Sequence, residues 1–505
     1  MKNKIQIFNI ALNWIRSNTL NGKGITVTSK KQKVYPEVTG YYIPSLLAWG
    51  ERELAVSYAK YLCSIQKADG SWYDSDGQAP YVFDSAQILK GLISIRGILP
   101  EADSCILKGC DWLLTNMQDN GRLTTPNRDA WGNDENFCSE LIHIYCLSPL
   151  VDAGKIFAKP EYTEAAHRIL EYYKREKMDK ILDFSLLSHF YAYVMEGLCD
   201  LGETALAHEC MERLAKYQNK KGEIPGLKNV SWVCSTGMFQ IALVWYKLGE
   251  LDKGNKAFDY ACSLQNASGG WYGSYASGSL SGKLGWKGKK PCYFPDEEIS
   301  WANKYFLDAL AQKQRLEFEK AAPIFMDNIG EDDGRLMLIE RLLKNYNKSI
   351  KICDAGCGKG RYLKRLSAKY PDNEYFALDI SERVMENITF PIRKETGRLT
   401  QIPYPDVSFD LVYACESLEH AVNLGGALNE LHRILKPGGQ LIIIDKPVEK
   451  LGELEIDEWE QWIADTDIQK FAQNIGASLA IEKSVSYEGK NDGLFRAWII
   501  TKGQD

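Results

Sequence analysis

The residues best suited to chemistry lie in a glycine-rich loop, residues 354–360, with the sequence DAGCGKG. An apolar run, Ile350–Cys353, precedes the loop, and a helical pattern resumes at Arg361. Glycines at alternate positions let the chain turn sharply and bring its backbone against a ligand. Asp379 follows a second apolar run, where its carboxylate can accept hydrogen bonds from both hydroxyls of a ribose. Strand, loop, helix and acidic strand end together predict a site for a nucleoside-bearing ligand.

The elements that must position this loop alternate between strand and helix. Short β-rich runs occur at five places: residues 350–353, 375–378, 411–413, 441–444 and 497–501. Helical patterns fit between them at residues 360–370, 381–388, 424–435 and 465–475. Such alternation predicts an α/β domain with a parallel, doubly wound, Rossmann-like sheet, which we expect over residues 335–505.

The loop and three downstream segments resemble those of class I S-adenosylmethionine-dependent methyltransferases. The match is to methyltransferase type 11, in the ubiquinone/menaquinone-type branch. The downstream segments read IPYPDVSFDLV at residues 402–412, ESLEH at 416–420 and LHRILKPGGQL at 431–441. The loop spacing Gly-x-Gly-x-Gly also departs from the dinucleotide-binding spacing Gly-x-Gly-x-x-Gly. The resemblance implies a methyltransferase whose cofactor is S-adenosylmethionine.

The resemblance also implies which residues bind the cofactor. They lie in the loop, beyond the second strand and beside the fourth strand: Asp354, Gly356, Cys357, Gly358, Gly360, Asp379, Ile380, Leu399 and Cys415. Among them, Asp379 is expected to hold the ribose, and Ile380 and Leu399 to cover the adenine. The family commonly has an aspartate for the adenine amino group where this sequence has Arg398. We therefore expect backbone groups to recognise that edge of the adenine.

Methyl transfer from a sulfonium is an in-line displacement, in which the protein mainly aligns the nucleophile. A hydroxyl acceptor also needs a general base. Three candidate catalytic residues lie at the expected end of the fourth strand: Glu416, Glu419 and His420. His420 is the first candidate for that base, and the alternative is a structural histidine packed behind the cofactor. Asp445 and Lys446, at the end of the fifth strand, are expected to form a solvated pair.

The first 315 residues have a different sequence pattern, which predicts helices separated by a recurring Gln- or Asn-centred turn. The turn occurs at residues 64–73, 116–121, 216–222 and 263–272, with a weaker copy at 16–22 and room for a degenerate copy near 172–180. A repeat of about fifty residues indicates a repeat architecture. We expect six helical hairpins that close into an all-α (α/α)6 toroid. Its inner helices are expected to begin near Glu37, Asp84, Asn136, Asp183, Ser231 and Glu298.

The Gln-x-x-x-Gly-x-Trp turns at residues 66–72 and 265–271 resemble the repeats of the squalene cyclase and protein prenyltransferase superfamily. The cyclases' Asp-x-Asp-Asp motif is absent, since the nearest string, residues 74–77, ends in glycine. Terpene cyclisation is therefore not expected. Aromatic, acidic and amide side chains near the inner-helix starts suit a carbohydrate instead. The substrate-binding candidates are Glu37, Tyr41, Asp84, His189, Trp232 and Trp301, while core packing or helix capping is the alternative for each.

These features support three hypotheses for the toroid. It binds a small-molecule, sugar or glycan acceptor and presents it to the methyltransferase, as in polysaccharide biosynthesis. Alternatively, it is a separate glycan lyase, hydrolase or epimerase, or a structural platform. A further alternative is that the C-terminal domain binds its cofactor only as a sensor. The chain would then transfer no methyl group to any acceptor.

The amino-acid composition limits the remaining possibilities for the partners and the location of the protein. The chain has 505 residues, 45% hydrophobic and 25% charged, which suits a soluble protein of several domains. A formal net charge of -6 gives no sign of a nucleic-acid partner. The first residues lack a signal-peptide core, and no apolar window suits a membrane span. We expect a toroid over residues 1–315, a linker over 316–334 and the methyltransferase domain over 335–505.

The 13 cysteines include no Cys-x-x-Cys pair, so we expect reduced thiols, a cytoplasmic location and no metal site. A zinc site built from distant Cys, His and Asp residues is the alternative.

Overall fold

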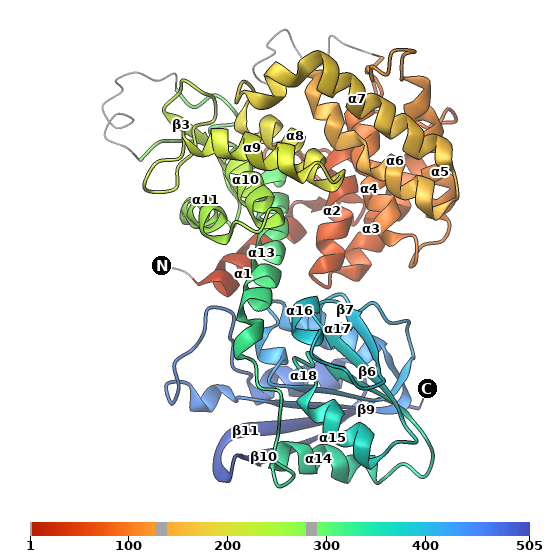
Figure 1. Cartoon of the computed structure of the whole chain (residues 1–505), viewed down its shortest axis with the longest axis vertical. Helices are drawn as coiled ribbons and strands as arrows, with labels where there is room; N and C mark the ends of the chain where they lie inside the picture. Colours follow the sequence, from red (N-terminus) through yellow and green to blue (C-terminus); the bar gives the residue numbers. More distant parts are fainter. Residues whose placement is uncertain (1–2, 127–138, 279–289, 505) are drawn as a thin grey trace. The chain divides into compact units, whose positions relative to one another are not determined.

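The computed structural model describes residues 3–126, 139–278 and 290–504, and the chain divides into two compact units (Figure 1). Unit 1 comprises most of residues 6–313, and unit 2 comprises residues 314–504 with the short segments 3–5 and 48–51. The expected inner-helix start at Asn136 lies outside the described residues. In the described part of the chain, no helix is both long and apolar enough to cross a membrane.

Unit 1 is almost entirely helical. Its helices are α1 (Lys4–Ser17), α2 (Pro36–Ala48), α3 (Arg52–Ile65), α4 (Val82–Ile95), α5 (Ala102–Thr115), η2 (Glu140–Cys146), α6 (Ser148–Ile156), α7 (Pro160–Leu182), α8 (Ser188–Asp200), α9 (Thr204–Ala215), α10 (Ser235–Lys247), α11 (Leu251–Ser263) and α13 (Ser300–Ala321). Two small antiparallel pairs complete it: β1 (Thr19–Leu20) with β2 (Gly24–Ile25), and β3 (Trp232–Cys234) with β4 (Ser274–Ala276).

The four stronger copies of the repeated turn share one geometry. Each contains a glycine with φ between 91° and 100°, namely Gly70, Gly121, Gly222 and Gly269. A Cβ at any of these positions would lie within 2.7 Å of a backbone carbonyl oxygen on another helix. The four helices are α5, α7, α11 and α1, in the same order. Glycine is therefore required twice, for the left-handed backbone and for the close approach. Each turn packs on a helix of the next hairpin, and the last turn returns to α1.

A second series of contacts joins the helices that follow the turns. Gly40 of α2 packs on the backbone of Ile88 in α4, and α4, η2, α8 and α10 contact one another in that order. The ring centroids of Phe239 in α10 and Phe306 in α13 lie 5.5 Å apart. The Tyr42 hydroxyl of α2 donates to a backbone oxygen at the start of α13, at 2.6 Å. This series therefore also returns to its first helix.

Unit 1 departs from the expected regular hairpins in two places. The third segment of the inner series, η2, is a 3-10 helix followed by the short α6, so the described residues of this repeat contain no full inner α-helix. The degenerate turn expected near residues 172–180 is absent, because α7 continues to Leu182 with only Lys177 outside helical geometry. As a result, α8 begins at Ser188 and not near Asp183.

Unit 2 contains a seven-stranded sheet in the order β10-β11-β9-β8-β5-β6-β7. The strands are β5 (Lys351–Ala355), β6 (Glu374–Asp379), β7 (Arg393–Thr396), β8 (Phe409–Cys415), β9 (Leu435–Asp445), β10 (Ser478–Tyr487) and β11 (Lys490–Thr501). The first five are parallel, whereas β11 runs antiparallel to both β9 and β10. The expected Rossmann-like α/β fold is thus confirmed for this unit.

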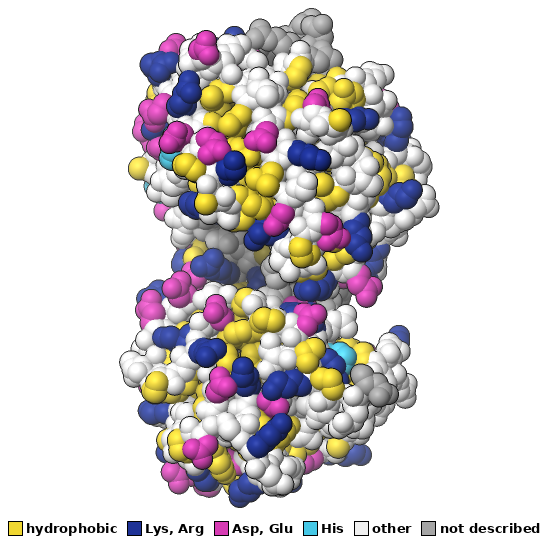
Figure 2. Space-filling model, turned by 90° about the vertical axis from the view of Figure 1, so that its right-hand side faces the viewer, with side chains coloured by type: hydrophobic (Ala, Val, Ile, Leu, Met, Phe, Trp, Pro, Cys, Tyr) yellow, Lys and Arg dark blue, Asp and Glu magenta, His cyan; other side chains and the backbone are white. Residues whose placement is uncertain are grey.

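Five α-helices accompany the sheet: α14 (Gly334–Leu343), α15 (Arg361–Lys369), α16 (Glu382–Met385), α17 (Leu424–Arg433) and α18 (Asp465–Asn474). Alternate residues of the same strands enter two separate apolar clusters, as Ile352 and Cys353 of β5 do. Successive strand side chains face opposite sides, so both faces of the sheet are buried. Charges of both signs are interspersed on the face that Figure 2 draws.

The chain order of the strands reverses direction between β5 and β8. In open α/β sheets, ligands bind beyond the carboxyl ends of strands at such a switch point. The carboxyl ends of β5 and β8 carry the glycine loop and residues 416–420 respectively. The topology therefore directs both sequence motifs to one edge of the sheet.

Candidate functional site

The glycine loop is fastened to the end of the neighbouring strand β6. The amides of Gly356 and Cys357 both donate to the carbonyl oxygen of Leu378, at 2.8 and 2.9 Å. Gly356, with φ of 86°, sits so close to the end of β8 that its Cβ would lie 2.3 Å from Ser417 Cβ. An alanine here would both strain the backbone and clash, so the loop depends on this glycine.

Asp379 is held between the loop and the start of α16. Its Oδ2 accepts from the Gly358 amide at 2.9 Å, and its Oδ1 accepts from the Ser381 amide at 3.0 Å. Burial raises the pKa of Asp379, and these amides act in the opposite direction. The acidic strand end and the glycine loop are therefore parts of one structure.

A cavity of about 560 Å³ lies over this edge of the sheet in unit 2. Most sequence-predicted residues of the C-terminal domain line it: Gly356, Cys357, Gly358, Asp379, Ile380, Leu399, Cys415, Glu416, Glu419 and His420. Two predicted cofactor residues, Asp354 and Gly360, are not in its wall. Asp354 is 1% exposed, and burial raises its pKa to about 8. It lies behind the loop, not at its surface.

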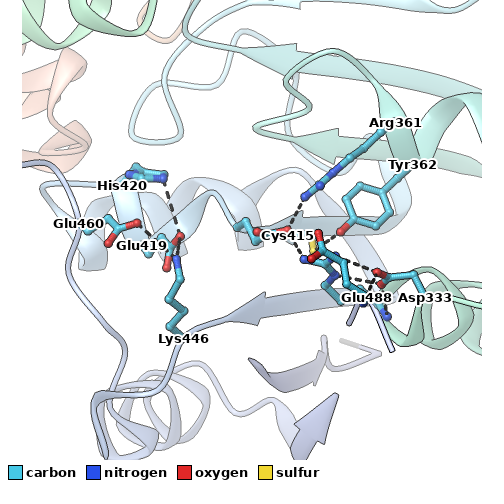
Figure 3. A network of polar contacts seen from close by, with 11 residues as sticks. Asp333, Arg361, Tyr362, Cys415, Glu419, His420, Lys446, Glu460 and Glu488 are labelled. Carbon is cyan, nitrogen blue, oxygen red and sulfur yellow. Dashed lines mark hydrogen bonds and ion pairs between the residues drawn. The ribbon is translucent and has the colours of Figure 1, made fainter. Parts of the chain in front are cut away.

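Glu416 is bound by two arginines, Arg335 and Arg361, of which Figure 3 labels Arg361. Its Oε1 lies 2.7 Å from Arg335 Nη1 and also accepts from Arg361. Asp333 holds the other side of the Arg335 guanidinium, at 2.8 Å. Glu416 also has a φ of 53°, a conformation that non-glycine residues rarely adopt. Because its carboxylate is paired with two guanidinium groups, the arrangement suits an anchor better than a proton acceptor.

Cys415, the last residue of β8, donates from Sγ to the Tyr362 hydroxyl at 3.0 Å. Burial raises the pKa of Cys415 well above its ordinary value. The thiol therefore stays protonated at neutral pH and is not an activated nucleophile.

Glu419, Lys446, Glu460 and His420 form the second group in Figure 3. Lys446 Nζ lies 2.7 Å from Glu419 Oε1 and 3.3 Å from Glu460 Oε1. His420 Nε2 lies 3.7 Å from the same oxygen of Glu419. The Lys446 ammonium therefore occupies the position between two carboxylates that a cation would take.

The expectation that Asp445 and Lys446 form a solvated pair is wrong. Asp445 is 0% exposed and Lys446 is 9% exposed. Asp445 Oδ2 accepts from the Leu418 amide at 3.1 Å, whereas Lys446 turns to Glu419. The two residues stabilise the segment that carries Glu419 from two sides.

Burial moves the two titrating groups of this cluster in opposite directions. It raises the pKa of Glu419, which is 1% exposed, to about 7. It lowers the pKa of His420 to about 4. At neutral pH His420 is therefore uncharged, and both protonation states of Glu419 are populated. Among the described residues, nothing forms a hydrogen bond with Glu419 Oε2.

An apolar wall leads away from His420. The Phe318 ring meets the His420 ring edge-on, with centroids 5.4 Å apart, and stacks on Phe325 at 6.3 Å. Ile324 and Met326 continue this wall at the rim of the cavity. These residues come from the end of α13 and the segment after it, which contain no recognisable motif.

Arg398 also lines the cavity. It donates to Gln314 Oε1, and Gln314 Nε2 donates to the carbonyl oxygen of His420 at 2.9 Å. Burial lowers the pKa of Arg398 to about 10, which leaves it cationic at neutral pH. The unusual arginine thus belongs to the cavity wall and supports the His420 segment through Gln314.

In unit 1, four of the six predicted substrate residues gather. Glu37 Oε2 accepts from Trp301 Nε1 at 3.3 Å, and the centroids of Trp301 and His189 lie 6.4 Å apart. Asp84 Oδ2 accepts from the Tyr35 hydroxyl at 3.2 Å, and Tyr35 meets Trp301 edge-on. Burial, reinforced by Asp84, raises the pKa of Glu37, and burial raises the pKa of Asp84 to about 7.

The other two candidates in unit 1 are buried as well, as Glu37 and His189 are. Tyr41, one turn after Glu37, is 1% exposed and packs near Tyr305. Trp232 is 0% exposed, and its ring fills the space beside Gly226, where a Cβ would lie 2.1 Å away. Trp232 therefore packs in the core, because its neighbour has no side chain.

The sequence analysis missed several residues of the cavity wall, namely Arg361, Phe318, Phe325 and Glu460. It also missed Arg335, which binds Glu416. Arg361 directly follows the loop, so its place at the start of α15 was a usable signal. The others lie outside every motif, and the fold alone brings them to the site.

Part of unit 2 is similar in sequence to known methyltransferases. Residues 353–443 match the methyltransferase domain family. The malonyl-acyl-carrier-protein O-methyltransferase of Dechloromonas aromatica is 29% identical over 153 residues, 30% of this chain and 56% of that protein. The sterol 24-C-methyltransferase erg-4 of Neurospora crassa is 35% identical over 101 residues, 18% of this chain and 26% of that protein. The chain thus spans about half or less of the length of these curated relatives.

Among solved structures, a chain from the complex of the Haloferax volcanii Trm112 methyltransferase activator with a putative methyltransferase has a TM-score of 0.30. It is 18% identical, and the match covers 37% of this chain and 98% of that one. Unit 2 contains a methyltransferase domain, and S-adenosylmethionine is its cofactor.

Proposed function

We propose that the whole chain is an S-adenosylmethionine-dependent methyltransferase that acts on a hydroxyl group of a small-molecule, sugar or glycan acceptor. One observation carries this proposal. A single cavity has Gly358 and Asp379 in one part of its wall and Glu419 and His420 in another. Cofactor and acceptor can therefore lie next to each other in one cavity, as an aligned displacement requires.

The residues around the loop fit the cofactor. A Cβ on Gly358 would have no neighbour nearer than Phe325 Cδ1, at 3.9 Å, so the loop backbone is open there. Asp379 is the proposed partner of the ribose, and Ile380 and Leu399 are the proposed contacts of the adenine. When bound, the cofactor supplies an electrophilic methyl group on a sulfonium.

Adenine recognition is proposed to use the backbone. A guanidinium has only donors, so Arg398 cannot accept a hydrogen bond from the adenine amino group. Carbonyl groups of residues 397–400, which line the cavity, are the proposed acceptors. Asp354 and Gly360 are proposed to act indirectly, by holding the loop from behind.

The three catalytic candidates receive different roles. Glu419 is the proposed general base, because its pKa lies near neutrality and one of its oxygens is free to accept a proton. His420 is proposed to orient the acceptor as a neutral ring. Glu416, paired with Arg335 and Arg361, is proposed to hold the end of β8 in place. Cys415 is proposed to line the methyl-donor side as a neutral thiol.

We propose that unit 1 is an (α/α)6 toroid that binds the acceptor and presents it. Two series of helix contacts that both return to their first member support this architecture. Residues 1–315, 316–334 and 335–505 remain the proposed toroid, linker and methyltransferase domain, although α13 extends to Ala321. A cytoplasmic role in polysaccharide biosynthesis is the proposed setting.

A second candidate is a bifunctional chain whose unit 1 processes glycans. It is favoured by the buried carboxyl groups of Glu37 and Asp84, whose pKa values are both raised. Two carboxyl groups with shifted pKa values are a common acid–base arrangement. A structural platform would need neither group.

Calorimetry with S-adenosylmethionine, followed by transfer of a radiolabelled methyl group to sugar nucleotides and cell-surface glycans, tests the proposal. Micromolar binding and a methylated product are expected. Absence of binding would contradict cofactor use. Binding without product from any acceptor would support a sensor instead of an enzyme.

A further inference from the structure

The rim of the cavity exposes two large apolar side chains. Ile324 is 84% exposed and Met326 is 53% exposed, and both line the cavity. Single exposed apolar residues are ordinary on protein surfaces. These two differ because they are separated by one residue and continue into a cavity. Apolar surface at a binding cavity marks contact with an apolar part of a ligand.

The apolar surface is continuous from the rim to the ends of the strands. Phe325, between Ile324 and Met326, stacks on Phe318, and Phe318 meets the His420 ring edge-on. Ala321 and Val422 also line the cavity. A ligand that reaches the base therefore passes along aromatic and aliphatic side chains.

The inner end of this path is polar and has an unused acceptor. Glu419 lines the cavity, is 1% exposed, and directs Oε1 to Lys446. In the described part of the chain, Glu419 Oε2 has no hydrogen-bond partner. A buried carboxylate oxygen without a partner is costly, so it points to a ligand group that donates a hydrogen bond.

We propose that the acceptor is amphipathic. Its hydroxyl group donates to Glu419 Oε2, and an apolar body lies along Phe318 and Phe325 and leaves the cavity between Ile324 and Met326. The acceptor is thus an alkyl- or aryl-bearing molecule, such as a lipid-linked sugar, and not a free sugar. The acceptor oxygen forms its bond to the methyl carbon, its proton passes to Glu419, and the cofactor leaves as the neutral thioether. This inference rests on the proposed methyl transfer at the same cavity.

The test uses the full chain saturated with S-adenosylhomocysteine and the neutral apolar fluorophore N-phenyl-1-naphthylamine. Fluorescence titration measures binding to the native protein, to the double variant Ile324→Ser/Met326→Ser and to Met337→Ser. Met337 is the matched control, since it is also 53% exposed but lies on α14 and not in the cavity wall. Both substitutions affect exposed side chains, so folding should be unchanged, as a thermal melt will verify.

We expect the fluorophore to bind the native protein and the Met337→Ser protein equally. Its dissociation constant should rise about tenfold in the double variant, because two apolar contacts are lost. Equal binding by native protein and double variant, or no binding to either, would overturn the inference. Binding of S-adenosylhomocysteine, measured separately by calorimetry, should be the same in all three proteins. Its absence would contradict the proposed function instead.

Discussion

Glu419 Oε1 lies 2.7 Å from Lys446 Nζ, whereas Oε2 of the same buried carboxylate has no hydrogen-bond partner among the described residues. One oxygen therefore fixes the side chain and the other stays available. A general base needs both properties, because it must be aligned and still able to accept a proton. Glu419 is therefore a better candidate for the general base than Glu416 or His420.

Replacing Glu419 by glutamine removes the proposed proton acceptor with little change in shape. We expect kcat to fall about 100- to 1,000-fold, the usual loss for a general base. Binding of S-adenosylhomocysteine, measured by calorimetry, should be unchanged. Glu453→Gln is the control, because Glu453 is paired with Lys450 on the surface. Equal activity of the two variants would refute the assignment.

The pH dependence of kcat gives an independent test. Burial raises the pKa of Glu419 to about 7, so its ionised fraction grows from roughly a tenth to nine tenths between about pH 6 and pH 8. The rate should rise with pH over this range and then level off. His420, whose pKa burial lowers to about 4, should contribute no change there. If the residual kcat of the Glu419→Gln protein showed the same inflection with pH, the inflection would belong to another group.

The same raised pKa also affects the free energy of unfolding. Whereas kcat should rise with pH, the stability contributed by Glu419 should fall. A carboxyl group whose pKa is higher in the folded state than in the unfolded state binds its proton more tightly when folded. Its contribution is fully present below the unfolded pKa of about 4 and is lost as the pH rises through about 7. Glu419→Gln should therefore lose less stability than the native protein over that range.

Glu416→Gln should destabilise unit 2, because it leaves Arg335, which is 2% exposed, without one of its two carboxylate partners. Removing one partner of a buried pair costs about 3 kcal/mol. Glu331→Gln is the control, since Glu331 is 85% exposed beside Arg365 and should change stability by less than about 0.5 kcal/mol. Urea unfolding followed by tryptophan fluorescence measures both. Equal midpoints would show that the pair is not structural.

Gly356→Ala should weaken cofactor binding without unfolding the sheet. Its Cβ would lie 2.3 Å from Ser417 Cβ at a φ of 86°, so the loop must move. Calorimetry should show affinity for S-adenosylhomocysteine lower by about tenfold or more. Gly425→Ala in α17 is the control, because its nearest neighbour would lie 3.9 Å away. Similar affinities in the two variants would show that the loop tolerates a side chain.

Glu37→Gln, Asp84→Asn and His189→Gln together test the role of unit 1. The raised pKa values of the two carboxyl groups favour their neutral forms, so amides are close substitutes for folding. We expect methylation of the acceptor to fall at least about tenfold while S-adenosylhomocysteine binding persists. Asp183→Asn, at an exposed ion pair, is the control.

Other outcomes of that triple variant would contradict acceptor presentation. Unchanged methylation would indicate a platform. Loss of a second activity toward glycans, with methylation retained, would indicate a bifunctional chain.

Much of unit 2 was predictable because its buried strands are apolar and its loops carry glycine signals. Two strands were missed for a physical reason. Strand β7 reads Arg-Lys-Glu-Thr and is exposed throughout, so burial left no pattern to detect. Strand β10 has only two buried residues and pairs only with β11 on this edge. Backbone hydrogen bonds hold both strands in the sheet. Because such bonds require no particular side chains, they produce no recognisable pattern in the sequence.

The candidate site was predictable only where residues lie next to a motif. Glu419 and His420 follow the fourth strand, so their arrival at the cavity could be predicted. Arg335 is distant in sequence from Glu416, and no local pattern links them. Lys446 directly follows β9, but its charge suggested solvent, and only the buried Glu419 explains its position.

The left-handed backbone at Glu416 places two opposing demands on one residue. Glycine or asparagine would relax the chain there, whereas Arg335 and Arg361 require a carboxylate of glutamate length. Populations of variants selected for folding alone should drift toward the smaller residues. Populations selected for turnover should retain glutamate. The identity of residue 416 after laboratory evolution would therefore report which pressure was applied.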